Sequence, residues 1–362
     1  MPLTCASRAD LRATPFRDFP YPRLLGASPL AAPGPTGLHN TCLSTCTGGT
    51  WQATPETFRV EEIPAYPWCG EGEHAALTVE KVGLTTRDLA SGVARILGVS
   101  SSAVGYAGMK DKHATTVQGF TVTGVVTERA AAAFTEAGGR VLQATRHRNK
   151  LRLGHLAGNR FRIWLSGANP EYCRVTLEQL ESHGVPNYYG PQRFGARGDN
   201  AAEGLRVLRG EKRVKRWQHD LLTSALQSFV FNEVLARRLE AGELEVALAG
   251  DVLRKEDSGG LFLCTDPEED GERVRTFAVS PTGPMPGRKM VAPGAEVTRQ
   301  EASVLADLGL EESLFAPLRG TRRGLRARVE GTAVEPAEGG VWLIFSLPAG
   351  SFATVLLREL TE

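Results

Sequence analysis

The sequence lacks the features of a membrane or secreted protein. None of its apolar runs approaches the ~18 consecutive residues that a transmembrane helix needs. The first 23 residues mix arginine with aspartate and do not follow the basic, apolar, small-residue order of a secretory signal. We therefore expect a soluble, cytoplasmic protein that makes no membrane contact.

Cysteine is scarce and poorly spaced for metal binding. The chain has six cysteines in 362 residues and no C-x-x-C pair. A chain of this length can bury a full core without disulfides, so reduced thiols are the simplest interpretation. One set, His39, Cys42, Cys46 and Cys69, could be drawn as a zinc site, but its spacing is looser than that of known zinc modules. We therefore expect no bound metal.

Sequence signatures of cofactor-dependent enzymes are also missing. There is no G-x-x-x-x-G-K-[ST] phosphate loop, no G-x-G-x-x-G fingerprint, no H-E-x-x-H and no G-x-S-x-G. These absences argue against P-loop NTPases, dinucleotide enzymes, zinc proteases and serine hydrolases. A methyltransferase would also need a glycine-rich loop after a strand, which we do not find. Any chemistry should therefore rest on side chains alone.

The chain has almost no net charge, +1 from 42 Lys and Arg against 41 Asp and Glu. Its basic residues are nevertheless concentrated in three stretches that contain one acid in total, Glu211. The stretches are 140–162, 206–216 and 319–328. Such local excesses fit phosphate contacts, although any one of them could equally be a solvated surface.

The pattern of apolar residues predicts an α+β fold. Residues 1–47 are rich in Pro, Gly, Ala, Ser and Thr without periodicity, and we interpret them as a flexible N-terminal extension. Alternating strands and amphipathic helices follow, including hairpin-like neighbours, which favours a mixed, mostly antiparallel sheet flanked by helices. Expected strands include 58–60, 74–82, 120–122 and 161–165; helices should follow Thr86 and Asn169-Pro170.

The region from 184 to 317 has a different character. It contains a long helical pattern over 221–239, a glycine-rich turn at 258–260, a Pro/Gly stretch, and a capping box at Thr298–Glu301 that predicts another helix. A strand pattern returns at 341–347, before a last helix that Ser351 can cap. We therefore expect residues 48–183 and 318–362 to form one domain, with 184–317 as an inserted α+β domain.

One segment, Gly105–Gln118, gathers charged side chains among small residues. Asp111 lies between Lys110 and Lys112, with His113 next to them and glycine nearby. Two neighbouring cations favour the ionised carboxylate, which can act as a nucleophile or a base. Taken alone, this segment could also be a charged surface turn held by salt bridges.

Four long blocks of the sequence form motifs: AGMKDKHA at 107–114, KLRLGHLAGNRF at 150–161, GVPNYYGPQRFG at 184–195 and LPAGSFAT at 347–354. In this order they resemble the sequence blocks of the tRNA pseudouridine synthase D (TruD) family. Two shorter matches lie at 55–60 and 70–74. Agreement of one block by chance is plausible, but agreement of four in order is not.

The resemblance implies a pseudouridine-synthase-like catalytic domain, an inserted TruD domain, and isomerisation of uridine at position 13 of tRNA without cofactor. It implies that Asp111 is the catalytic carboxylate, that Phe58 and Phe352 line the base pocket, and that Asn159 hydrogen-bonds the substrate. Phe161 is a further candidate, either in the pocket or in the core. Lys110, Lys112 and Arg160 are candidates for phosphate contacts, with a solvated surface as the alternative.

The expected partner is tRNA, bound by a monomer with no obligatory protein partner. The alternative function is a non-catalytic structured-RNA-binding protein of the same fold. The presence of the aspartate argues against that alternative.

Overall fold

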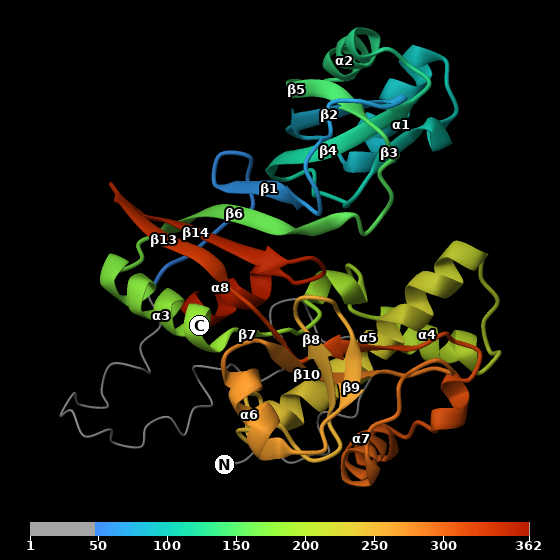
Figure 1. The fold of residues 1–362 in the computed structure, drawn as a ribbon, viewed down its shortest axis with the longest axis vertical. Helices are drawn as coiled ribbons and strands as arrows, with labels where there is room; N and C mark the ends of the chain where they lie inside the picture. Colours follow the sequence, from blue (N-terminus) through green and yellow to red (C-terminus); the bar gives the residue numbers. More distant parts are fainter. Residues whose placement is uncertain (1–47, 362) are drawn as a thin grey trace. The chain divides into compact units, whose positions relative to one another are not determined.

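The structure is a computed structural model that describes residues 48–361 (Figure 1). The N-terminal extension expected over 1–47 lies outside these residues, as do His39, Cys42 and Cys46 of the zinc set considered above. The described chain divides into two compact units. The sheet unit comprises residues 48–182, 329–353 and 360–361, and the inserted unit comprises 183–328 with 354–359.

The compact inserted unit runs from His183 to Arg328, whereas the sequence analysis expects an insertion over 184–317. Two strands account for the difference. Strand β11 (Thr321–Gly324) pairs with β10 (Val279–Met285), and β12 (Arg326–Ala327) pairs with β7 (Val185–Pro186). Both strands are rich in arginine and show no alternating apolar pattern, so no local signal indicated that they complete the insertion.

The sheet unit is built on one eight-stranded sheet with the order β13-β14-β6-β1-β4-β2-β5, and β3 pairs beside β4. Every pairing in it is antiparallel except β1 with β4, which confirms the expected mixed sheet. The strands are β1 (Phe58–Pro64), β2 (His74–Lys81), β3 (Val104–Tyr106), β4 (Thr115–Thr123), β5 (Arg140–His147), β6 (Leu156–Ser166), β13 (Glu330–Ala337) and β14 (Gly340–Pro348).

Two helices cover part of this sheet and enclose a core. Helices α1 (Thr86–Leu97) and α2 (Thr127–Glu136) pack with β2 and β4 around Phe120 and Phe134. The hydroxyl of Thr85, not that of Thr86, caps α1 in a capping box with Asp88. Thr86 instead turns inward and is fully buried.

Helix α3 (Pro170–His183) begins as expected, because Asn169 Oδ1 accepts the backbone N–H groups of Glu171 and Tyr172. The chain then enters the inserted unit.

The inserted unit has its own sheet and helices. The sheet has the order β11-β10-β8-β9, with β8 (Val252–Lys255) and β9 (Leu261–Leu263) joined by the expected glycine-rich turn. Its helices are α4 (Asn200–Leu208), α5 (Arg216–Glu240), α6 (Pro267–Arg275) and α7 (Ala295–Asp307), and α8 (Ala353–Thr361) contributes 354–359.

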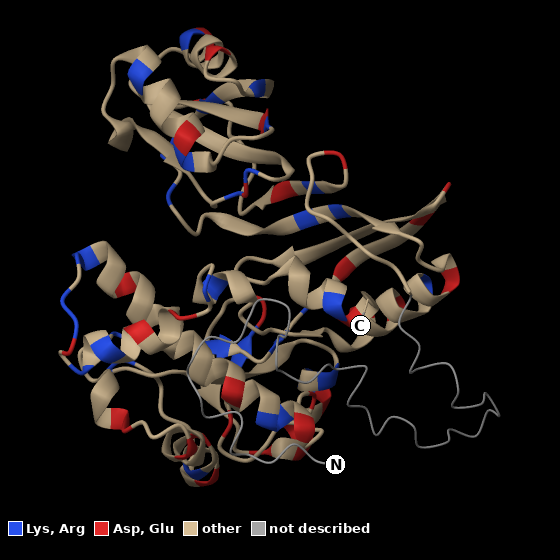
Figure 2. Cartoon of the chain, turned by 180° about the vertical axis from the view of Figure 1, so that it is seen from behind, with Lys and Arg blue, Asp and Glu red and all other residues tan. Residues whose placement is uncertain are grey.

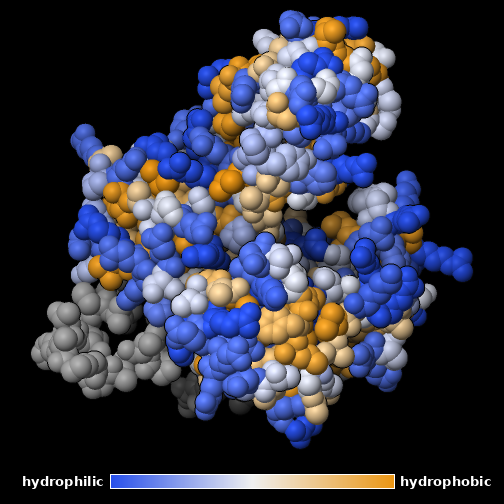
Figure 3. All heavy atoms as spheres, in the orientation of Figure 1, coloured by the Kyte–Doolittle hydropathy of each residue, from blue (hydrophilic) through white to orange (hydrophobic). Residues whose placement is uncertain are grey.

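Strand β9 exposes Leu261 and Leu263. Figure 3 shows apolar side chains gathered on one face of this unit. No helix in residues 48–361 is long and apolar enough to cross a bilayer.

Two details of the inserted unit differ from expectation. Helix α7 begins at Ala295 after Gly294, so Thr298 lies inside it rather than at its cap. Strand β10 is fully buried although it contains Pro281 and Pro284. Strand β8 pairs with Val279–Pro281, and β11 pairs with the residues that follow. Each proline therefore has a paired strand on one side only, so its missing N–H is tolerated.

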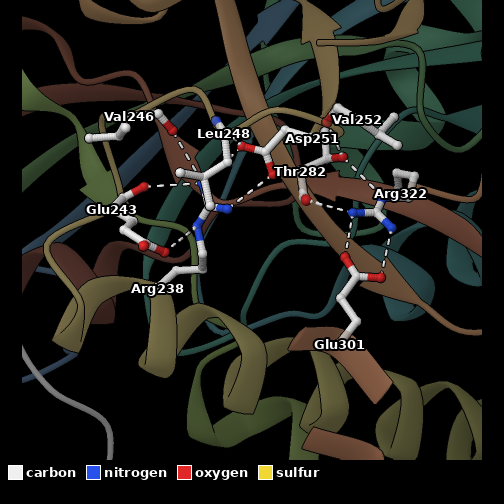
Figure 4. A network of polar contacts seen from close by, with 9 residues as sticks. All are labelled: Arg238, Glu243, Val246, Leu248, Asp251, Val252, Thr282, Glu301 and Arg322. Carbon is white, nitrogen blue, oxygen red and sulfur yellow. Dashed lines mark hydrogen bonds and ion pairs between the residues drawn. The ribbon is translucent and has the colours of Figure 1, made fainter. Parts of the chain in front are cut away.

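The arginines of the basic stretch 319–328 are largely internal. Arg322 makes a two-pronged ion pair with Glu301, at 2.6 and 3.0 Å, and its Nε donates to Thr282 Oγ1 (Figure 4). Burial raises the pKa of Glu301, while Arg322 opposes that rise. Arg326 is buried as well and pairs with Glu245. These arginines stabilise the inserted unit, which corrects the expectation of a phosphate-binding surface across this stretch.

Removing Arg322 alone should therefore destabilise the protein strongly. Arg322→Met leaves the Glu301 carboxylate buried without its cation, and we expect the free energy of unfolding to fall by about 3–5 kcal/mol. The double variant Arg322→Met/Glu301→Leu should recover most of that loss. Denaturant unfolding measures both, with Arg299→Met on the exposed face of α7 as a control that changes little. A double variant less stable than the single one would contradict this account.

Candidate active site

Asp111 lies in the loop between β3 and β4, and its carboxylate is exposed. Oδ1 accepts the backbone N–H of His113 at 3.1 Å, which orients the side chain. Within the described residues this is the carboxylate's only hydrogen bond. The remaining lone pairs are therefore available to a substrate.

The cation beneath this loop is Lys81, which the sequence analysis did not single out. Its side chain is 1% exposed, and Nζ donates to the carbonyl oxygens of Leu84 at 2.6 Å and of Asp111 itself at 3.0 Å. The carbonyl of Lys110 is 3.5 Å away. Burial lowers the pKa of Lys81 to about 8, although the charge of Asp111 opposes the shift. The sequence did contain a signal for this role, because Lys81 occupies an inward-facing position of the strand His74–Lys81.

Lys110 faces away from solvent, contrary to the expected phosphate contact. Its side chain is buried, and Nζ forms an ion pair with Glu62 Oε2 at 2.8 Å. The other oxygen of Glu62 accepts the backbone N–H of Gly119 at 3.2 Å. Gly108 makes room for this pair, because a Cβ there would lie 2.6 Å from Lys110 Nζ. Lys110 thus anchors the loop to strand β1.

Two further polar side chains fix the backbone of the loop. Thr86 Oγ1 accepts the N–H of Lys110 at 2.8 Å and donates to Gln118 Oε1 at 2.8 Å. Gln118 Nε2 in turn donates to the carbonyl of Gly108 at 3.1 Å. The loop that presents Asp111 is therefore held from α1, β2 and β4 at once, which limits its freedom before any substrate binds.

Strands β1 and β6 bring several of the expected substrate residues to one face of the sheet. Glu62 pairs with Asn159, and Val60 pairs with Phe161. Side chains alternate along a strand, so Phe58, two residues before Val60, shares this face. Asn159 Oδ1 is buried and lacks a hydrogen-bond partner in the described residues. A buried acceptor without a donor is costly and is frequent at binding sites.

The three candidate phenylalanines differ in exposure. Phe58 and Phe352 are partly exposed. Phe161 is 7% exposed, stacks on Phe345 at 5.3 Å between ring centroids, and meets the edge of Phe58 at 6.3 Å. Phe161 is therefore core that supports Phe58. The bond from the N–H of Ala349 to the carbonyl of residue 157 places the turn that leads to Phe352 beside the start of β6.

The remaining candidates are separated by the sheet. Arg160 is exposed, but it pairs with Glu61 and so lies on the face opposite to Asn159 and Phe161. Lys112 is exposed in the loop beside Asp111. Of the two lysines that flank the aspartate, Lys112 alone can meet phosphate.

The basic stretch 140–162 is partly neutralised by acids from elsewhere in the chain. Arg140 pairs with Glu80, Arg148 with Glu71, and Arg162 with Glu335. Lys and Arg lie among Asp and Glu over both units (Figure 2). Cys69 and Cys264 are among the free thiols of the structure. In residues 48–361, no group of three or more His, Cys, Asp or Glu side chains is positioned to hold a metal ion.

Comparison with known proteins first defines the fold. The structure matches a crystal structure from Methanosarcina mazei, assigned to tRNA pseudouridine synthase D (TruD), with a TM-score of 0.67. The match covers 88% of this chain and 94% of that one, at 23% identity. The chain thus has the fold of that structure, an α+β sheet domain with an inserted unit.

The sequence then defines the family. The family model described as tRNA pseudouridine synthase D (TruD) matches residues 38–214 and 209–360. A tRNA pseudouridine synthase D of Anaeromyxobacter dehalogenans (strain 2CP-C) is 44% identical, over 87% of this chain and 93% of that protein. One from Thermus thermophilus is 41% identical, over 87% and 89%. The chain belongs to the tRNA pseudouridine synthase D family.

The lowered pKa of Lys81 predicts a pH-dependent stability that Lys81→Met will lack. Between about pH 8 and the ordinary lysine pKa of 10.5, the folded protein holds fewer protons here than the unfolded chain. The free energy of unfolding should therefore rise with pH in this window relative to Lys81→Met, and the difference should be constant below it.

Denaturant unfolding of both proteins at about pH 7, 9 and 10.5 measures this difference. Groups that titrate equally in the two proteins cancel in the comparison. A difference that stays the same at all three values would mean that burial does not lower the pKa of Lys81.

Proposed function

We propose that the chain isomerises uridine to pseudouridine at position 13 of tRNA, with Asp111 as the essential carboxylate and without a cofactor. Family membership supports the activity on tRNA. The observation that carries the role of Asp111 is its geometry: an exposed carboxylate on a loop that four buried polar side chains fix from behind. Such preorganisation suits a group that must meet one atom of a substrate.

The reaction conserves atoms and electrons. The glycosidic bond from the uracil nitrogen to the ribose carbon breaks, the base rotates, and a carbon–carbon bond forms to the same ribose carbon. One proton leaves the base carbon and one is gained by nitrogen. Asp111 can attack the ribose or uracil, or take a proton from the sugar. No oxidant or reductant is required by this balance.

The neighbouring residues suit a flipped uracil. Extracting a base from a stack costs a few kcal/mol, and stacking on an aromatic ring returns about 1–3 kcal/mol. The partly exposed rings of Phe58 and Phe352 can provide this stacking, whereas Phe161 stiffens the position of Phe58 from below. The unpaired Oδ1 of Asn159 can accept the N–H of the uracil ring or a ribose hydroxyl.

We further propose that the sheet unit is the catalytic domain and that the inserted unit is the TruD domain, which helps to hold the tRNA. All the site residues named above belong to one chain and to the sheet unit, which supports action as a monomer. A cytoplasmic location follows from the substrate. Lys112 is the candidate in the loop for phosphate contact, and Arg160 is a candidate on the other face.

Asp111→Asn tests the proposal. The amide keeps the size of the side chain and can still bind RNA, but it is neither a nucleophile nor a base, so we expect turnover to fall below detection while the Kd for tRNA stays within about threefold. Asp220→Asn on α5 is the matched control and should behave as wild type. Pseudouridine mapping of tRNA with each purified protein gives the readout. Retained isomerisation by Asp111→Asn would overturn the assignment, and binding without turnover by the wild type would favour the non-catalytic alternative.

A pair of phenylalanine variants separates the pocket from the core. Phe352→Ala should lower turnover roughly ten- to a hundredfold through lost stacking, with a small loss of stability. Phe161→Ala should instead lower the free energy of unfolding by about 3–5 kcal/mol, because it removes a buried ring. Single-turnover kinetics and denaturant unfolding of both variants check the contrast, and wild-type kinetics for Phe352→Ala would remove that ring from the pocket.

A further inference from the structure

A basic groove lies in the sheet unit beside the loop of Asp111. It has a volume of about 470 Å³ and is open to solvent. Helix α1, the short helix η2 (Ser101–Ala103), strand β3 and residues 150–153 line it. Its polar lining includes Arg87, Ser101, Ser102, Tyr106, Lys150 and Arg152, and none of its lining residues is acidic.

The basic side chains of this groove form no ion pair within residues 48–361. Arg87 and Arg152 are exposed, and neither has an ion-pair partner among residues 48–361. Lys150 donates to the carbonyl of Ser102, which orients its ammonium without cancelling its charge. By contrast, Arg140 and Arg148 of the same basic stretch are paired with glutamates. Three cations that have no ion-pair partner in the described part of the chain thus line one groove.

The groove and the loop of Asp111 share two walls. Arg87 follows Thr86, whose hydroxyl accepts the N–H of Lys110. On the other side, the N–H of Gly154, next to the lining residues 150–153, donates to the carbonyl of Ala107 at 2.9 Å. Strand β3 lies between these segments. Its Gly105 allows Leu151 to approach closely, because a Cβ on Gly105 would lie 2.5 Å from the carbonyl oxygen of Leu151. The segments that line the groove are therefore hydrogen-bonded to, or continuous with, the loop that carries the carboxylate.

We propose that this groove binds the sugar–phosphate backbone of the tRNA strand that carries the target uridine. Guanidinium groups bind phosphate through two parallel hydrogen bonds, and the serine hydroxyls and the partly exposed phenol of Tyr106 add neutral donors. An open hollow whose cations come from two separate segments fits several consecutive phosphates better than one enclosed anion. The inference rests on the proposed function in that tRNA is the substrate, and it is independent of the role of Asp111.

The test compares Arg87→Gln/Arg152→Gln with Arg174→Gln/Arg299→Gln, which removes the same charge from exposed helix positions on α3 and α7. Unmodified tRNA is titrated at several salt concentrations, and initial rates are measured. For the groove variant we expect the Kd and KM to rise roughly tenfold for each arginine, with kcat at saturating tRNA within about twofold of wild type. The slope of log K against log salt should fall in magnitude by about 1 for each lost contact. The control should show neither change.

Other results overturn the proposal. Equal Kd values and salt slopes for the two double variants would show that the groove does not hold the RNA backbone. Inorganic phosphate and uridine monophosphate are titrated in the same way. If one of them binds the wild type as tightly as tRNA does, and the groove variant loses affinity for both that anion and tRNA, the groove is a small-anion site instead. An unchanged unfolding midpoint for the groove variant excludes a folding defect.

The outcome for the groove is separable from that for the proposed function. A wild-type protein that makes no pseudouridine, but loses tRNA affinity on Arg87→Gln/Arg152→Gln, would refute the proposed activity and support the groove. If the wild type modifies tRNA and the groove variant has an unchanged KM, the proposed activity is supported and the groove proposal is refuted.

Discussion

A single buried ammonium group holds the loop on which the candidate carboxylate lies. Lys81 has lost its hydration, and the carbonyl oxygens around it, including that of Asp111, replace the water. Ionised groups are seldom buried unless such partners are present, because desolvation costs several kcal/mol. One ammonium has three donors, so it can fix several backbone positions at once. The position of Asp111 depends on this arrangement.

The other anchors follow the same logic. Thr86, Gln118 and the Lys110–Glu62 pair occupy positions that a simple pattern would fill with apolar side chains, and their hydrogen bonds all end on the loop or on the strand beside it. A fully satisfied buried network stiffens what it holds. Strand β1, which carries Glu62, also carries Phe58, and the neighbouring strand β6 carries Asn159. Rigidity and substrate contact are thus built on adjacent strands.

Charge is distributed differently in space than along the chain. In the stretch 319–328, which contains no acid, Arg322 and Arg326 are buried and pair with Glu301 and Glu245 from distant segments. Within 140–162, Arg140, Arg148 and Arg162 form ion pairs. Arg152 has no ion-pair partner in residues 48–361 and lines one groove together with Arg87 and Lys150. A count of basic residues in a window therefore says little about a phosphate surface until the positions of the acids are known.

The sequence by itself determined the α+β class, the mostly antiparallel sheet, the helix starts at Asn169 and near Thr86, and the family, because periodicity, caps and ordered motifs are local properties of the chain. It also marked Asp111, which lies in the block 107–114 that resembles the family. It did not determine Lys81 or Glu62, the internal role of Lys110, the side of the sheet on which Arg160 lies, or the end of the insertion at Arg328. Each of these depends on which strands pair and in what register. Partners 48 residues apart, such as Lys110 and Glu62, meet only when the tertiary structure forms.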